Sequence, residues 1–526
     1  MNHDTKGTIK RAERFQVILI GEGILVGAIA GLVVLLYRIV LEYAGQWTQK
    51  ILAFAKGNLM WMAGWFLILV LLACVVARLL KYESMISGSG IPQLEGEMAG
   101  KLNQVWWKVL PAKFLGGFLC MLGGLALGRE GPSIQLGAMA GKGISQGLDR
   151  GKTEEKFLLT CGASAGLSAA FHAPLAGVMF SLEEVHKNFS VSVLVSVMSA
   201  SLTADFLSST VLGADSVFQF DILNALPMEY YWMIVLLGVV LGIMGAFYNW
   251  FTLKAQECYQ KATFLSPTMK IVIPFLCAGV LGFTAPKLLG SGHALIEELT
   301  HTEMMLGTIL LLLLGRFLFS AISFGSGTPG GIFFPLLVIG GFIGGAFASV
   351  GVQFFGLDSM YINNFVLLAM AGYFSAIVRA PLTGIILIFE MTGSLSQMLS
   401  LAIVSIVAYV VATLLKSKPI YESLLDRLLA KQGVKVPKEH GQKILTNYVI
   451  HQGAKVEGTL ICDTEWPDNC LLVAIQRGAE EIIPRGQTML LAGDIIVTMT
   501  DERDMPVVHE KMQRLCSEMI KTDERK

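Results

Sequence analysis

The sequence predicts an all-α polytopic membrane protein followed by a small α/β domain. Hydrophobic residues make up 54% of the 526 residues, and charged residues only 15%, well below the roughly 25% of a soluble chain. Apolar segments recur up to about residue 431, and many of them are short and begin at Gly or Pro. Beyond that point the composition turns polar and short β-like runs appear. These three observations set the fold class.

Charge and cysteine content exclude several functional classes. The 40 Lys and Arg residues balance 40 Asp and Glu residues, so the chain is not a basic nucleic-acid binder, and we expect no nucleic-acid partner. The eight cysteines form no CxxC pair, and most lie in or beside apolar runs. We interpret them as small buried hydrophobes, and we expect neither a metal site nor a cofactor.

The predicted membrane domain covers residues 16–431. Residues 1–15 are polar and basic and form a predicted cytoplasmic segment, by the positive-inside rule. The run over 15–37 is too long for a signal-peptide core and predicts a first membrane helix. Further long apolar segments are 59–80, 228–251, 268–289, 304–323 and 397–415; shorter ones are 109–127, 131–144, 157–171, 174–185, 331–350, 364–377 and 381–392. Broken helices are tolerated at membrane depth only inside protein or along a cavity, so the short segments predict a transport site.

The C-terminal part is predicted to be a linker over 432–445 and a small domain over 446–526. Its β-like runs are 470–475, 480–483 and 493–499, separated by turn signals, and the second part of its charged tail is predicted to be helical. Lys and Arg residues near 427–438 place this domain on the cytoplasmic side, together with the N-terminus.

An internal repeat divides the membrane domain. His-Ala-Pro-Leu-Ala-Gly at 172–177 matches Arg-Ala-Pro-Leu-Thr-Gly at 379–384, and a carboxylate follows each Pro by nine positions, at Glu183 and Glu390. A Gly- and Pro-containing element precedes each copy, at 128–133 and 330–335. Two matched elements in the same order predict two related halves, with the transport site at their broken segments.

Three helix-start motifs carry the candidate chemistry. Gly88-Ser89-Gly90-Ile91-Pro92 offers a Ser N-cap and a Pro in the first turn, and a helix N-terminus is an anion site. Gly128-Arg129-Glu130-Gly131-Pro132-Ser133 puts a carboxylate at such a start, where it competes with an anion and acts as a gate. Gly330-Gly331-Ile332-Phe333-Phe334-Pro335 offers amide dipoles without charge. The structural alternatives are a capped helix, an Arg–Glu pair and close helix packing.

Two further groups have both a functional and a structural interpretation. Glu183 and Glu184 end an apolar helix. They form either a solvated helix end or a proton acceptor at the inner mouth of the transport path. The repeat accounts for Glu183 and leaves Glu184 unexplained. Tyr421 begins the last apolar helix. It is either an aromatic residue of the membrane interface or a residue whose phenol hydroxyl donates to a bound anion. The role of Glu22 in the first membrane helix stays open.

Two motif matches point to other classes. Gly162-Ala163-Ser164-Ala165-Gly166 matches GxSxG, and His172 is nearby, which keeps an intramembrane serine hydrolase as a distant alternative. Gly325, Gly327 and Gly330 match GxGxxG, but no Val/Ile-rich strand precedes them.

In their order, these elements resemble the CLC family of chloride channels and chloride/proton antiporters, over roughly residues 16–431. The resemblance implies inverted halves, a homodimer with one pore per subunit in the bacterial inner membrane, and transported chloride and protons. It implies chloride contacts from the hydroxyls of Ser89 and Tyr421 and the amides of Ile332 and Phe333. It assigns Glu130 as the external gate and Glu184 as the internal proton glutamate, which favours H⁺/Cl⁻ exchange over a passive gated channel. The supporting residues are Gly88, Gly90, Lys113, Gly128, Arg129, Gly131 and Pro132.

Residues 471–497 resemble the C-terminal half of an RCK (TrkA-C) module, whereas better-known CLC members carry CBS-type domains. The resemblance leaves two roles open, a sensor for an unidentified small ligand and a dimer-stabilising appendage. An RCK-like module also accompanies cation systems, but the chain has no TVGYG-like filter.

Overall fold

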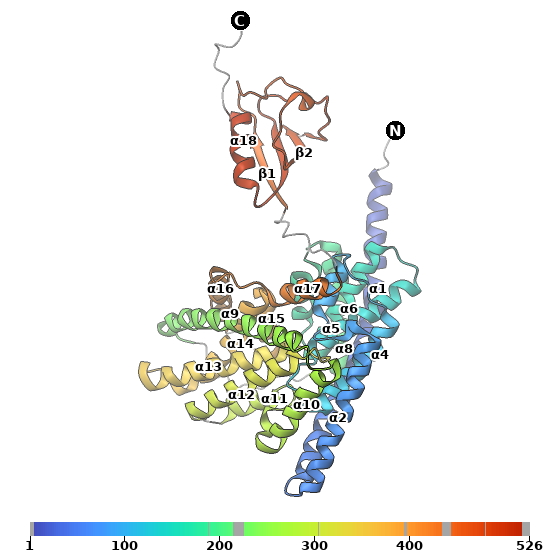
Figure 1. Cartoon of the computed structure of the whole chain (residues 1–526). Helices are drawn as coiled ribbons and strands as arrows, with labels where there is room; N and C mark the ends of the chain where they lie inside the picture. Colours follow the sequence, from blue (N-terminus) through green and yellow to red (C-terminus); the bar gives the residue numbers. More distant parts are fainter. Residues whose placement is uncertain are drawn as a thin grey trace. The chain divides into compact units, whose positions relative to one another are not determined.

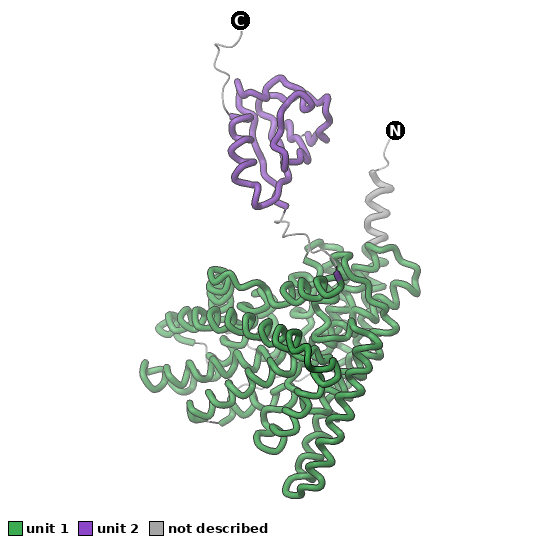
Figure 2. Tube along the Cα trace, viewed as in Figure 1, with its two compact units in different colours: residues 1–432 green, residues 433–526 purple. Residues whose placement is uncertain are grey.

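The computed structural model describes residues 5–187, 189–213, 226–302, 304–393, 397–433, 443–478 and 480–517, and the side chains from residue 16 onward. The chain divides into two compact units, Met1–Gln432 and Gly433–Lys526 (Figure 2). Each unit is described by itself below. The predicted linker lies largely outside the described residues, as do residues 1–4 of the predicted N-terminal segment.

The described part of the first unit is helical (Figure 1). Eight of its helical segments are long and apolar enough to cross a membrane, which makes it a multi-pass membrane unit. Its α-helices are α1 Thr5–Ala55, α2 Leu59–Tyr82, α3 Ile91–Met98, α4 Trp106–Leu122, α5 Glu130–Gly147, α6 Lys152–Phe171, α7 Pro174–Phe180, α8 Val191–Leu212, α9 Tyr231–Lys261, α10 Pro267–Thr284, α11 His293–His301, α12 Leu306–Gly325, α13 Phe333–Phe355, α14 Ile362–Val378, α15 Pro381–Thr392, α16 Met398–Leu414 and α17 Ile420–Lys431.

Four helices differ from the sequence-based expectation. The first was predicted over 15–37, but α1 runs from Thr5 to Ala55, and its polar residues Arg38 and Glu42 line a vestibule within the unit. The α8 helix was missed, because its many serines weaken the apolar signal. The α13 and α14 segments, expected to be short, are long enough to span.

Small residues let the helices of the first half pack closely. Three glycines spaced four apart on α1 face small residues of α8: Gly23 faces Ser196, Gly27 faces Ala200 and Gly31 faces Ala204. A Cβ added to Gly27 would lie 2.3 Å from the Ala200 carbonyl oxygen, so no larger residue fits there. This small-residue spacing is typical of helix association in membranes, and it shows how a serine-rich α8 is held.

The sequence repeat corresponds to two sets of helices, α5–α8 and α13–α16. The loops before α5 and α13 meet in an antiparallel bridge, in which the Gly128 amide donates to the Gly331 carbonyl at 2.7 Å and the Gly331 amide donates to the Gly128 carbonyl at 2.8 Å. The two breaks therefore join at one point and run in opposite directions there, as inverted halves require.

The two repeat carboxylates cap each other's helices. Glu183 follows α7, and its carboxylate accepts from the amide and hydroxyl of Thr383 at 2.9 and 2.8 Å, at the start of α15. Glu390 lies in α15 and accepts from the amides of Leu175 and Ala176 at 2.9 and 2.7 Å, at the start of α7. Reciprocal capping accounts for the spacing of nine residues, because each short helix presents its end to the start of the other.

We expect Glu390→Ala to destabilise the protein by about 1–2 kcal/mol, the usual cost of losing a helix cap. The substitution leaves two first-turn amides of α7 without an acceptor. The melting temperature in detergent measures the effect. Glu422→Ala is the matched control, because Glu422 is an exposed carboxylate paired with the exposed Lys187, and it should change stability little. Equal melting temperatures for both variants would contradict the capping role.

The described part of the second unit contains a four-stranded antiparallel sheet and the helix α18. Its strands are β1 Lys443–Val449, β2 Cys470–Arg477, β3 Glu480–Ile482 and β4 Ile495–Asp501, in the order β1-β4-β2-β3, and α18 spans Met505–Ser517. The predicted strands and tail helix are present, and β1 begins inside the predicted linker. Tyr448, Ile475 and Ile496 pack against Val508 and Met512 of α18 in a core of this unit's own.

An ion pair closes the turn before β4. Arg477 donates from Nε and Nη2 to the two oxygens of Asp494, each at 2.8 Å, and the Leu491 amide donates to Asp494 at 2.9 Å. This guanidinium holds the pKa of the Asp494 carboxyl below its usual value.

A lowered pKa in the folded state predicts acid lability in this turn. The pair's stabilisation is complete above the unfolded pKa of Asp, about 3.9, and is lost as pH falls through the lower folded value. Hydrogen exchange of β4 amides in the full chain should therefore accelerate as the pH falls below about 4, after correction for intrinsic rates. Asp494→Asn should accelerate exchange already at neutral pH and remove this pH step. Retention of the step in the variant would assign it to another group.

Candidate functional site

The loop that carries Ser89 is tightly built around two glycines. Gly88 and Gly90 have φ of +64° and +94°, and the helix cap before α3 is Gly90 rather than the predicted Ser89. The Ser89 hydroxyl accepts from the Ile91 amide at 3.3 Å. Among the described residues no acceptor is found for its own hydrogen, which leaves this buried O–H free to donate.

Lys113 anchors this loop through hydrogen bonds to its backbone. The ammonium is fully buried and donates to the carbonyls of Ile86 at 2.9 Å and Gly88 at 2.6 Å. The Gly88 carbonyl also accepts from the Gly330 amide at 3.0 Å, which ties the loop to the break before α13. The lysine thus brings positive charge near Ser89, while its hydrogen bonds fix the backbone of the loop.

Glu130 is buried at the start of α5, next to the bridge between the halves. Its carboxylate interacts with the backbone amides at the starts of α5 and α13, including that of Phe334, and Arg129 Nε lies 3.8 Å from Oε1. A Cβ added to Gly128 would lie 2.4 Å from Glu130 Oε2, so only glycine leaves room for the carboxylate there. Two helix N-termini therefore hold one anionic group.

The start of α13 lies beside this carboxylate. Ile332 is the cap residue and Phe333 the first residue of the helix, and both are fully buried. A Cβ on Gly331 would lie 3.1 Å from the Gly131 amide nitrogen, and one on Gly131 would lie 2.9 Å from Ser89 Cβ. The starts of α3, α5 and α13 thus meet through glycines, with Pro132 in the first turn of α5.

Tyr421 is in the first turn of α17, which packs against α3. Its side chain is fully buried, and its hydroxyl has no hydrogen-bond partner among the described residues. An unpaired buried hydroxyl is costly, so this O–H is a candidate donor to a bound group. Its charged neighbours include Glu184 and Glu130.

A vestibule of about 470 Å³ leads to Glu130. Its lining includes Arg38, Arg129, Lys287 and His293, against the carboxylates of Glu42 and Glu130. The His293 ring stacks on Phe334 with centroids 5.6 Å apart. Cationic groups thus outnumber anionic ones at this entrance, which favours the entry of anions. A second, smaller cavity of about 70 Å³ reaches Ser89 and is lined by Arg427 and Lys431 of α17.

Glu184 lies in a widened helical turn, η2 Ser181–His186, that continues α7. It is buried and interacts with the buried carboxylate of Glu95 on α3, and Lys187 follows at the end of the turn. Sequence reasoning missed Glu95, although it lies only three residues beyond Pro92. Both oxygens of Glu95 and Oε1 of Glu184 have no hydrogen-bond partner among the described residues, so two carboxylates lie close together here without hydrogen-bond donors for these oxygens.

The hydrolase alternative fails on geometry. Ser164 and His172 are eight residues apart on and just after α6, which separates them by about 12 Å along the helix. His172 Nε2 lies 2.6 Å from Arg38 Nη1, and His172 Nδ1 lies 3.2 Å from Ser209 Oγ, so both ring nitrogens already have hydrogen-bond partners. The glycines around Ser164 pack against the backbone of α5, so GxSxG serves helix contact here. Glu22 has a structural partner, Arg150.

The comparisons decide the family. Residues 70–413 match the model described as voltage gated chloride channel, about two thirds of the chain. The chain belongs to the CLC family. It is 36% identical over 420 residues to the H(+)/Cl(-) exchange transporter ClcA of Vibrio cholerae, covering 78% of this chain and 89% of that protein, and 35% identical to ClcA of Klebsiella pneumoniae, covering 77% and 88%.

Solved structures agree with this CLC assignment. A slow cyanobacterial Cl⁻/H⁺ antiporter superposes with a TM-score of 0.75 at 31% identity, covering 79% of this chain and 99% of that one. A CLC-type fluoride/proton antiporter shares the fold, with a TM-score of 0.64 at 22% identity over 77% of this chain and 97% of that one. Residues 445–513 match the TrkA-C domain model, as the sequence of the second unit predicted.

Proposed function

We propose that this CLC protein exchanges chloride for protons across the membrane. The observation that carries the proposal is the placement of two buried carboxylates. Glu130 lies at the joined starts of α5 and α13, next to the vestibule, and Glu184 lies in the turn after α7, with the unpaired hydroxyl of Tyr421 near both. The relatives described as chloride/proton exchangers support the same conclusion.

Chloride is held by neutral donors in this proposal. The hydroxyls of Ser89 and Tyr421 and the amides of Ile332 and Phe333 donate to the ion, because these buried groups surround the meeting helix starts. Amide and hydroxyl dipoles bind an anion without trapping it, whereas a direct ion pair would slow its release. The ammonium of Lys113 does not contact the ion in this proposal, because its hydrogen bonds go to the carbonyls of the loop that carries Ser89.

Glu130 is the gate in this mechanism. Its carboxylate occupies the amides that an anion would use, so chloride and the ionised side chain exclude each other. Protonation removes the negative charge, and the neutral side chain swings toward the vestibule. Each time chloride replaces the carboxylate at these amides, Glu130 must bind a proton. The movement of chloride is therefore coupled to the movement of protons.

Glu184 delivers the proton from the inner side. It is buried beside Glu95, and the Lys187–Glu422 ion pair at 2.8 Å lies at the adjoining exposed surface. A passive gated channel needs only the outer gate, so this inner carboxylate pair favours exchange over the channel alternative. Such a channel would reverse at a potential set by chloride alone.

The proposal extends to orientation and assembly. We propose that both ends of the first unit, and the second unit, lie in the cytoplasm of an inner-membrane protein. The basic flank of α1 and the cations of α17 support this orientation. The family resemblance supports a homodimer with one pore in each subunit. The TrkA-C unit serves as a ligand sensor or as a dimer-stabilising appendage, and no metal or cofactor enters the mechanism.

Coupled flux in liposomes tests the proposal. A chloride gradient should drive protons uphill, and the reversal potential should lie between those of chloride and protons. Vesicles that conduct chloride without any uphill proton movement would instead identify a channel.

A further inference from the structure

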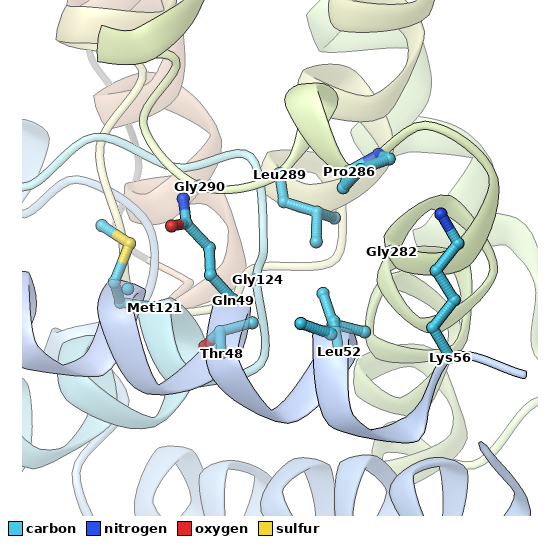
Figure 3. A pocket seen from close by; sticks show the side chains of 12 residues that line it. Thr48, Gln49, Leu52, Lys56, Met121, Gly124, Gly282, Pro286, Leu289 and Gly290 are labelled. Atoms are coloured by element: carbon cyan, nitrogen blue, oxygen red, sulfur yellow. The ribbon is translucent and has the colours of Figure 1, made fainter. Parts of the chain in front are cut away.

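A third cavity lies beside the vestibule and has no part in the exchange mechanism. It has a volume of about 270 Å³, close to the lower end of the roughly 300–1,000 Å³ of ligand pockets. Figure 3 shows Thr48, Gln49, Leu52 and Lys56 on the α1 side, with Leu289 and Pro286 opposite. Most of its exposed lining is apolar in character, and Lys56 is the one charged residue on it.

The cavity depends on glycines in its walls. A Cβ on Gly282 would lie 2.8 Å from Leu52 Cδ2, and one on Gly124 would lie 3.3 Å from Leu289 Cδ1. Arg316 fixes the opposite wall, because its buried guanidinium donates to the carbonyls of Leu288 at 2.9 Å and Gly290 at 2.7 Å. The space is therefore built into the packing of rigid segments.

The polar groups of the cavity define its ligand. The Thr48 hydroxyl is already bonded to the carbonyls of Ala44 and Leu122 at 2.8 and 2.7 Å. Lys56 is exposed and has no ion-pair partner in the part of the chain that the structure describes. In Figure 3 it lies at one end of the cavity and Met121 at the other. A lone cation at one end of an apolar slot matches an alkyl chain with an anionic head.

The location of Lys56 fits a ligand that comes from the bilayer. It lies at the turn between α1 and α2, where exposed Phe54 and Trp61 contact each other with ring centroids 5.1 Å apart. Exposed Trp and Lys residues at the ends of membrane helices mark the headgroup level. Amphiphiles in a bilayer carry their charged heads at this same level.

The far end of the cavity borders the route to Glu130. Met121, Leu289 and Gly290 line both this cavity and the vestibule, and so does Gln49 of α1. We propose that the cavity binds the alkyl chain of a singly charged anionic amphiphile, with its head on Lys56, and that the occupied cavity slows ion passage through the vestibule. The chain passes Leu52 and Leu289 and ends at Met121, on the shared wall.

Binding is tested with 1-decanesulfonate, which stays ionised and carries no proton across the bilayer. Below its micellar concentration it should raise the melting temperature of the wild-type protein in neutral detergent, and Lys56→Gln should weaken this effect about tenfold in concentration. Lys50→Gln is the matched control, since Lys50 is an exposed lysine of α1 outside the cavity lining, and it should behave as wild type. Ala53→Trp, which fills the slot, should abolish the shift.

Flux then tests the consequence and the source of the ligand. In neutral liposomes, external 1-decanesulfonate should slow chloride efflux severalfold in wild type and much less in Lys56→Gln, while decyltrimethylammonium should have no effect. If phosphatidylglycerol vesicles slow the wild type relative to Lys56→Gln, a bilayer lipid is the ligand; if only the added sulfonate does, it is a free amphiphile. Equal melting shifts in wild type, Lys56→Gln and Ala53→Trp would overturn the proposal, whatever the proton coupling proves to be.

Discussion

Glu130→Ala should abolish proton movement and leave chloride flux intact. The wild-type carboxylate is held by the amides at the starts of α5 and α13, and it is the only titratable group that this structure places on those amides within the described residues. Alanine frees these donors for chloride permanently and removes the group that carries the proton. We expect the reversal potential of the variant to follow chloride alone.

The control for this experiment is Glu42→Ala, since Glu42 is the other carboxylate that lines the vestibule. Its coupling should stay that of wild type. Uphill proton movement in Glu130→Ala would show that another group carries the proton, and it would remove Glu130 from the gate.

Glu184→Gln should lower proton flux by about 10²-fold, within the range of a lost proton-transfer group, while chloride still passes. The amide keeps the size of the side chain and its contact with Glu95, but it cannot release a proton. The proposed chloride contacts are at Ser89, Tyr421 and the start of α13, so we expect anion movement without this residue. Paired chloride and proton recordings in liposomes measure the split.

The neighbouring carboxylate provides a matched control. Glu183→Gln loses the charge and one of the two acceptor oxygens that cap α15, so it should lower the melting temperature. Coupling should persist, because within the described residues this carboxylate bonds to the start of α15 and to nothing else. Equal loss of coupling in both variants would mean that Glu184 acts through the packing of this turn and not as a proton carrier.

The helix starts could be predicted because their signals are local. Gly88 and Gly90 flank Ser89, and Gly131 follows Glu130, each shortly before a Pro, and such short stretches indicate where a helix begins. The repeat in turn predicted that the two breaks correspond. The structure adds the bridge between Gly128 and Gly331, which no spacing in the sequence reveals.

Features that depend on three-dimensional pairing could not be predicted. Glu183 and Glu390 were recognised as a repeated pair, but each caps a helix more than 190 residues away, as with Glu183 and Thr383, 200 positions apart. Glu95 could be recognised as a candidate site residue only from its position next to Glu184 in the structure. The serines of α8 lowered the apolar signal of a membrane helix. In the structure their hydroxyls bond to backbone carbonyls, as Ser201 does to Pro174 at 2.7 Å, and the sequence does not show these partners.

The central claim is that neutral donors, rather than a cationic side chain, hold the anion within the membrane. Bromide scatters anomalously and can replace chloride, so an anomalous difference map of bromide-soaked crystals tests the claim most directly. We predict a peak in contact with the Ser89 and Tyr421 hydroxyls and the Phe333 amide, strengthened in Glu130→Gln. A peak on the ammonium of Lys113, or no peak near these three groups, would contradict it.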